Sequence, residues 1–174
     1  HASLSDPRVK VVNDDAFTYV QDSKATYDVV LVDLVDPSNE KLAKLYSTEF
    51  YRSIEGRLAP EGVMVTQATS TFFSPHAFST VASTVAAAQP DRQILPFSTN
   101  IPSFGEWGFV LSTRTPQNLI SQPLPKGLTY QDRETLEFIM RTKPARTESM
   151  EPSTLLHPRI VEVYNQDMRQ WRYY

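Results

Sequence analysis

The chain has 174 residues, of which 40% are hydrophobic and 21% are charged, a composition typical of a soluble globular domain. The sequence contains no apolar run near the roughly 20 residues that a membrane-spanning helix needs. A formal net charge of -3, without any run of Lys or Arg, excludes the basic surface typical of nucleic-acid-binding proteins. Cysteine is absent, which excludes disulfides and thiol chemistry. We therefore expect a cytoplasmic domain without a nucleic-acid partner.

The first part of the chain predicts a strand–helix–strand unit. Residues 8–12 (RVKVV) and 27–33 (YDVVLVD) are β-branched runs of strand length, and residues 15–21 between them have a short helical pattern. A continuous apolar run is typical of a strand that is covered by helices on both faces of a parallel sheet. A second helix is expected at 47–58, ended by the proline and the glycine within 60–62.

The same alternation continues along the chain. A third strand is expected at 62–68, and the pair Ser74 and Pro75 begins the clearest helical pattern of the sequence. Two further strands, at 93–99 and 107–112, are joined by a short turn. The order β-α-β-α-β-α-β-β predicts an open α/β sheet, mostly parallel, with an antiparallel pair at one edge.

Residues 114–174 differ from the α/β core of residues 1–113 because prolines break them into short pieces. Helical patterns remain at 132–140 and 159–171, and the segment lacks the apolar residues for a core of its own. We expect a C-terminal extension that wraps around the core, so that residues 1–174 form a single domain.

Polar side chains follow the predicted strands at their carboxyl ends, where open α/β sheets bind ligands. Asp15 follows the first strand, Asp33 and Asp36 follow the second, and Gln67 ends the third. Such an acidic rim, without His or Cys, is poor for transition metals and for acyl transfer but suits a cationic ligand. Each Asp could instead cap a helix or turn, and for Asp15 both interpretations stay open. Pro37 fixes the turn after Asp36, which favours a binding role for Asp33 and Asp36.

Several motifs occur in a fixed order along residues 6–113. They are NDDAF at 13–17, YDVVLVDLVDP at 27–37, LYSTEFY at 45–51, GVMVTQA at 62–68 and IPSFGEWGF at 101–109. In order and spacing this set resembles the spermidine synthases, which are polyamine aminopropyltransferases with a class I S-adenosylmethionine methyltransferase-like (Rossmann-like) α/β fold. The last motif and the tail LLHPRIVEVY at 155–164 are more similar to a bacterial branch that is often fused to membrane-spanning segments.

The resemblance implies transfer of an aminopropyl group from decarboxylated S-adenosylmethionine, as co-substrate, to a diamine such as putrescine. The products would be spermidine and methylthioadenosine, and no metal is implied. Both substrates are cations, so an acidic rim would attract them. Asp33 would be the general base that takes a proton from the attacking amine. The resemblance implies substrate-binding roles for Asp36, Gln67 and Trp107 and cofactor-binding roles for Asp15, Ala16 and Pro37.

Two departures from the family pattern affect these expectations. All five glycines lie beyond residue 55, so the Gly-rich nucleoside-binding loop and the first strands of the family fold are expected to be missing. We therefore expect a processed chain or an expression fragment, about the C-terminal two thirds of a catalytic domain, inactive alone and with an exposed sheet edge. Ile101 replaces a Tyr that many family members have, which leaves the acceptor amine open. A homodimer, and membrane segments before His1 in the parent protein, are further expectations from the family.

Two other functions are compatible with the sequence. One is an S-adenosylmethionine-dependent N-methyltransferase on the same scaffold, which would release S-adenosylhomocysteine. The other is a non-catalytic polyamine-binding or interaction domain that keeps the acidic rim without turnover. A Gly-rich loop upstream of this chain would count against the second.

Overall fold

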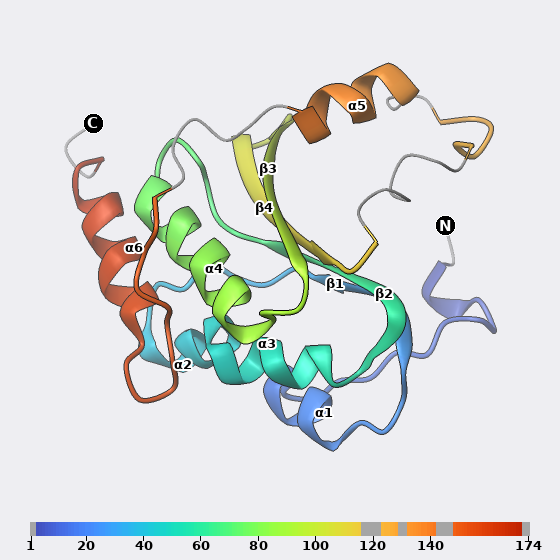
Figure 1. The fold of residues 1–174 in the computed structure, drawn as a ribbon, viewed down its shortest axis with the longest axis horizontal. Helices are drawn as coiled ribbons and strands as arrows, with labels where there is room; N and C mark the ends of the chain where they lie inside the picture. The colour runs from blue at the N-terminus through green and yellow to red at the C-terminus, as the bar shows by residue number, and fades with distance from the viewer. Residues whose placement is uncertain (1–2, 116–122, 129–131, 142–147, 172–174) are drawn as a thin grey trace.

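The computed structural model describes residues 3–115, 123–128, 132–141 and 148–171 (Figure 1). Its strands form one mixed sheet in the order β1-β2-β4-β3, made of β1 (Tyr27–Val32), β2 (Leu58–Gln67), β4 (Gly105–Thr113) and β3 (Gln93–Ile101). Strands β1 and β2 are parallel, and β4 is antiparallel to both of its neighbours. The predicted open α/β sheet with an antiparallel edge pair is confirmed, although parallel pairing is limited to β1 and β2 in the described residues.

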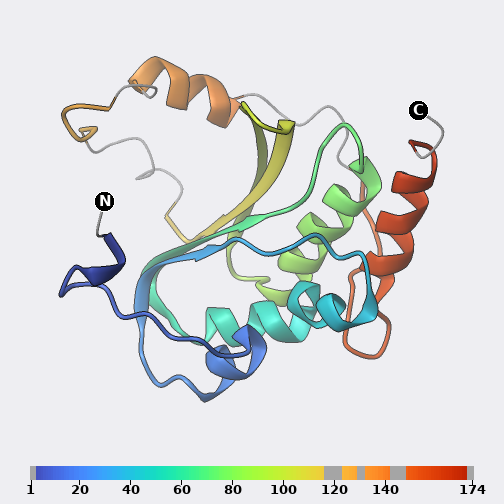
Figure 2. The ribbon, with the colours of Figure 1, turned by 180° about the vertical axis from the view of Figure 1, so that it is seen from behind.

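Residues 8–12 do not form the strand that their composition predicts. Val9, Val11 and Val12 are exposed, and no ladder joins this segment to the sheet in the described part of the chain. Figure 2 shows β1 in front of β2, with no further strand beyond it among the described residues. A β-branched run favours extended backbone, but a strand also needs a neighbour with which to exchange hydrogen bonds. The prediction of a strand here was wrong because it considered only composition.

The helices of the described residues include short 3₁₀ segments at Ser3–Ser5 (η1) and Lys44–Tyr46 (η2). The α-helices are α1 (Ala16–Asp22), α2 (Glu40–Ala43), α3 (Thr48–Glu55), α4 (Pro75–Ala88), α5 (Arg133–Arg141) and α6 (Arg159–Arg169). None of them is long and apolar enough to span a lipid bilayer.

Helix α3 is shorter than the sequence predicts. It begins after Ser47, whose Oγ accepts a hydrogen bond from Phe50 N at 3.2 Å, and it ends at Glu55 with Gly56 as C-cap. The residues from Leu58 onward already belong to β2, including the proline and glycine that were expected only to stop the helix. A Cβ on Gly62 would lie 2.9 Å from the carbonyl oxygen of Tyr27, so this glycine permits the close approach of β2 to β1.

The core lies on one face of the sheet, under α3, α4 and α6. Its largest fully buried side chains include Tyr51 of α3, Met64 of β2, Phe78 of α4 and Ile160 of α6. On the other face α5 packs against β3, and Leu31 of β1 is 74% exposed. The expectation that helices cover both faces of every strand is therefore wrong for β1, whose apolar run has only one buried side in the described structure.

Candidate active site

The parallel register of β1 and β2 brings two of the predicted site residues, Asp33 and Gln67, together. Val32 pairs with Thr66, so Asp33, the residue after β1, lies beside Gln67, the last residue of β2. Both line a cavity of about 350 Å³ with Trp107 of β4. The remaining lining residues are apolar: Leu31, Val32, Val65, Ile101, Phe104 and Phe109. Among the described residues that line this cavity, Asp33 is thus the one that carries a charge.

The side-chain amide of Gln67 is held by four hydrogen bonds. Its Nε2 donates to the carbonyl oxygen of Leu34 at 2.8 Å and to the hydroxyl of Tyr46. Its Oε1 accepts from Thr69 N at 2.9 Å and from Trp107 Nε1 at 3.2 Å. Gln67 is only 4% exposed, so these partners fix its orientation and join the ends of β1, β2 and β4.

Tyr46 extends this network to the loop after β1. Its hydroxyl donates to the carbonyl oxygen of Val35 at 2.9 Å while it accepts from Gln67. Burial raises the pKa of the Tyr46 hydroxyl far above its usual range, so this phenol stays neutral. Tyr46 lies within the motif LYSTEFY at 45–51, but nothing in that motif indicates its contact with Gln67.

Asp36 lies beside this network and is held by the C-terminal helix. The hydroxyl of Tyr164 in α6 donates to Asp36 Oδ2 at 2.9 Å. Burial raises the pKa of the Asp36 carboxyl, and the hydrogen bond from Tyr164, with the nearby Gln67 amide, opposes that rise. Pro37, the next residue, is buried. No pattern in the sequence indicates the contact with Tyr164, because the two residues lie 128 positions apart along the chain.

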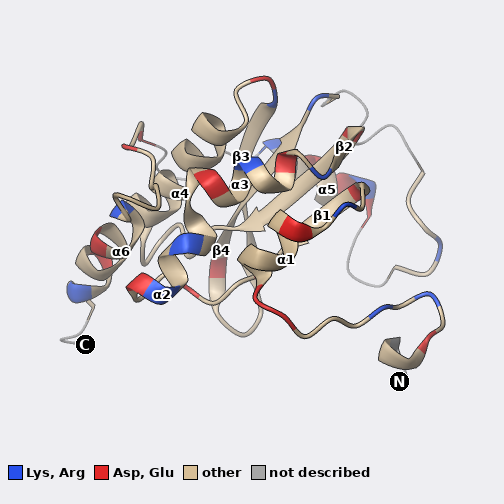
Figure 3. Cartoon of the chain, turned by 90° about the horizontal axis from the view of Figure 1, so that it is seen from below, with Lys and Arg blue, Asp and Glu red and all other residues tan. Residues whose placement is uncertain are grey.

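Asp15 caps a helix in this structure. Its Oδ1 accepts a hydrogen bond from Thr18 N at 3.0 Å at the start of α1, and its Oδ2 forms an ion pair of 2.7 Å with Lys44 Nζ. Hydrogen bonding to Lys44 lowers the pKa of the Asp15 carboxyl. Figure 3 shows acidic residues in the segment that leads into α1 and both signs of charge near α2. Fewer carboxylates are therefore available to a cationic ligand than the sequence predicts. In the described residues Asp33 and Asp36 have no ion pair, whereas the charge of Asp15 is paired with that of Lys44.

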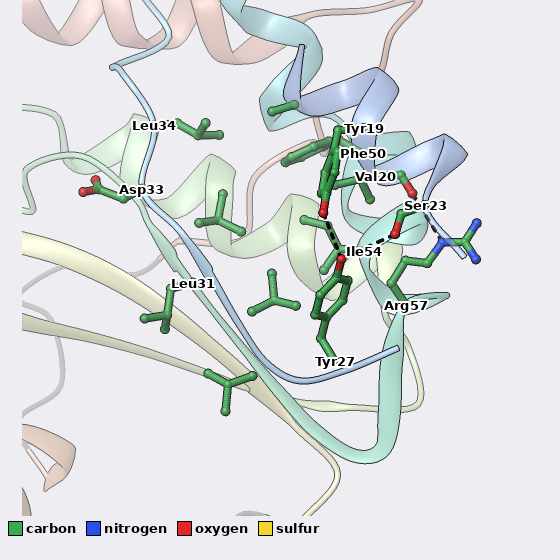
Figure 4. Close-up of a pocket in the computed structure, with 14 residues that line it drawn as sticks. Tyr19, Val20, Ser23, Tyr27, Leu31, Asp33, Leu34, Phe50, Ile54 and Arg57 are labelled. Atoms are coloured by element: carbon green, nitrogen blue, oxygen red, sulfur yellow. Dashed lines mark hydrogen bonds between the residues drawn. The ribbon is translucent and has the colours of Figure 1, made fainter. Parts of the chain in front are cut away.

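Ala16 lines a second cavity of about 350 Å³, between α1, α3 and the edge of β1 that pairs with no strand among the described residues. Figure 4 shows Asp33 at one end of it and the hydroxyl groups of Tyr19, Ser23 and Tyr27 at the other. Most of its remaining lining is apolar. Asp33 lines both cavities, and Figure 4 shows its carboxylate pointing away from the side chains of α1 and α3. Asp15, Asp36 and Pro37 line neither of these two cavities.

Comparison with known proteins identifies the family. The spermine/spermidine synthase domain model matches residues 1–122. The chain belongs to the spermine/spermidine synthase family. Polyamine aminopropyltransferase 1 of Streptomyces coelicolor is 41% identical over 177 residues, covering 99% of this chain and 32% of the relative. The polyamine aminopropyltransferase of Mycobacterium tuberculosis is 39% identical, covering 96% of this chain and 32% of the relative. The chain therefore spans about a third of the length of these family members.

Solved spermidine synthase structures share the fold. The structure of spermidine synthase in complex with the transition-state analogue AdoDATO superposes with a TM-score of 0.67 at 21% identity, covering 82% of this chain and 50% of that one. Spermidine synthase from Thermotoga maritima gives 0.65 at 22% identity with the same coverage. The predicted family and the methyltransferase-like α/β fold class are therefore confirmed. In the described residues no three His, Cys, Asp or Glu side chains gather as metal ligands.

Proposed function

We propose that this chain carries the amine-activating part of an aminopropyltransferase active site, with Asp33 as general base. One observation carries the proposal: Asp33, without an ion pair in the described residues, lines two cavities at the carboxyl end of β1. A base in this position can face a sulfonium donor on one side and an acceptor amine on the other. The relatives named above are polyamine aminopropyltransferases.

The reaction is a displacement at carbon. An alkylammonium with a pKa of about 10.4 has no free electron pair near neutrality, so a base must accept a proton from the acceptor nitrogen. The nitrogen then forms a bond to the methylene carbon beside the sulfonium, and the carbon–sulfur bond breaks to release methylthioadenosine. The alignment of nitrogen, carbon and sulfur supplies much of the rate, which is a task for fixed side chains.

The other predicted residues take supporting roles in this proposal. Gln67 and Trp107 border the cavity on the acceptor side. Gln67 would act there by holding the Trp107 indole through its Oε1, so that the ring can pack against the methylene groups of the amine. Asp36 would bind the far ammonium group of the diamine. Ala16 lines the cavity beside α1, which would take the donor, and Asp15, the residue before it, would contact the donor from the start of α1. Pro37 would contact the donor as the family resemblance implies, although it lines neither cavity.

The test replaces Asp33 with Asn in the intact protein that contains this sequence. Asp33→Asn keeps the shape but removes the base, so we expect kcat for methylthioadenosine release from decarboxylated S-adenosylmethionine and putrescine to fall at least about a hundredfold. Asp28→Asn, an exposed carboxylate in the same strand, is the matched control and should keep its activity.

Two results would contradict the proposal. Unchanged aminopropyl transfer by Asp33→Asn would remove Asp33 from the chemistry. Wild-type protein that releases S-adenosylhomocysteine from S-adenosylmethionine, or that binds putrescine without turnover, would exclude aminopropyl transfer as its activity.

A further inference from the structure

Helix α6 reaches the candidate site through one side chain. Tyr164 lies near the middle of α6, and its hydroxyl donates to Asp36 Oδ2 at 2.9 Å. Both side chains are half-buried. The contact joins a loop at the carboxyl end of β1 to a helix near the end of the chain, and the function proposed above gives Tyr164 no role.

Three other contacts hold α6 in place. Asn165 Nδ2 donates to the carbonyl oxygen of Ser38 at 3.3 Å, in the same loop as Asp36. Asp167 is 3% exposed and accepts hydrogen bonds of 2.9 and 3.0 Å from the first backbone amides of α4. Trp171 Nε1 donates to the carbonyl oxygen of Phe73 at 2.9 Å. The Tyr164 phenol therefore sits on an anchored helix, so the position of its hydroxyl is defined without help from Asp36.

Among the described residues around Asp36, the Tyr164 hydroxyl is the side-chain group that donates a hydrogen bond to its carboxylate. Tyr164 from α6 and Tyr46 from η2 are the titratable groups whose electrostatic interactions involve Asp36, and burial raises the pKa of both phenols, so both stay neutral. Gln67 from β2 contributes an amide. No Lys, Arg or His among the described residues forms an ion pair with Asp36. A half-buried carboxylate without a cation depends on such hydrogen bonds to remain ionised.

We propose that Tyr164 is a positioning residue for the acceptor substrate, holding the Asp36 carboxylate oriented to receive an ammonium group of a diamine. The inference rests on the proposed function, because it assigns to Asp36 the binding of that ammonium. Tyr164 touches no reacting atom in this scheme. Its hydroxyl orients one oxygen of Asp36. Because the phenol is neutral, the negative charge of the carboxylate remains available to pair with the ammonium group of the substrate.

The test is Tyr164→Phe in the intact protein, assayed for aminopropyl transfer over a range of pH. Loss of a hydrogen bond to a charged group should raise KM for putrescine roughly tenfold near neutrality. We expect kcat to stay within about twofold, because the base and the donor are untouched. The acid limb of kcat/KM for putrescine should move to higher pH, since the hydrogen bond that lowers the pKa of Asp36 is gone.

Two further variants separate positioning from general loosening of α6. Asn165→Ala removes the neighbouring contact of the same helix with the same loop, and should leave the acid limb in place. In an Asp36→Asn background Tyr164→Phe should add no further loss, because its effect passes through the Asp36 charge.

The outcomes distinguish this inference from the proposed function. Wild-type activity with an unchanged KM and acid limb in Tyr164→Phe would overturn the role of Tyr164 alone. An equal shift of the acid limb in Asn165→Ala, or a full additional loss in the Asp36→Asn background, would overturn it as well. Absence of aminopropyl transfer in the wild-type protein would overturn the proposed function, and this inference with it.

Discussion

Gln67 shows how much of the site depends on the orientation of one amide. The sequence places an amide at the end of a strand, which is enough to nominate it for ligand binding. The structure adds that both ends of this amide already have protein partners, among them the Leu34 carbonyl and the Trp107 indole. Those partners come from other strands and loops, so no local pattern could predict them.

Gln67→Glu tests the network that this amide holds together. A carboxylate would lose the two donated hydrogen bonds and place negative charge against the Leu34 carbonyl, in a site that is 4% exposed. We expect a loss of about 3 kcal/mol in the free energy of unfolding, measured by urea denaturation. Gln93→Glu, at an exposed position at the start of β3, should change it by less than about 0.5 kcal/mol. Equal losses in both variants would show that the network does not stabilise the fold.

At the scale of elements, the predictions succeed where the signal is local. Ser74 does precede α4 and Pro75 is its first residue, and Phe78, Val81 and Val85 of the predicted apolar spacing are buried. The capping itself differs from the expectation: Ser74 Oγ bonds to Thr69 Oγ1 at 2.9 Å and makes no cap contact with α4. The cap is Asp167, which lies 90 or more residues further along the chain. Long-range capping leaves no periodicity in the sequence and was therefore not predictable.

Asp167→Ala should measure the energy of that long-range cap. The substitution leaves the first amides of α4 without their acceptor, and it also removes the 2.6 Å contact with His76 Nδ1. We expect a loss of about 2 kcal/mol in unfolding free energy, at the upper end for N-cap substitutions. Gln166→Ala, at the exposed neighbouring position of α6, is the control. A loss no greater than that of the control would mean that packing alone holds α6 on α4.

At the scale of the whole molecule, strand order and layer arrangement follow from different information. Alternation of apolar runs and amphipathic segments predicts an α/β sheet, because each run must pair and each helix must bury one face. The same runs do not tell whether one or both faces of a strand are covered. Residues 8–12 and 27–33 are similarly apolar, yet the first has no sheet partner in the described structure and the second forms β1.

A pair of neighbouring substitutions in β1 tests the one-sided burial of this strand. Leu31 is 74% exposed on the open face, whereas Val32 is 8% exposed and belongs to the core under the helices. Val32→Ala should cost about 2 kcal/mol in unfolding free energy. Leu31→Ala should cost less than about 0.5 kcal/mol, although it removes more apolar atoms, because those atoms are already in water. Urea denaturation of the 174-residue chain gives both values. If Leu31→Ala costs as much as Val32→Ala, the face is covered in solution. The apolar run of β1 then has two buried sides, as the sequence predicts.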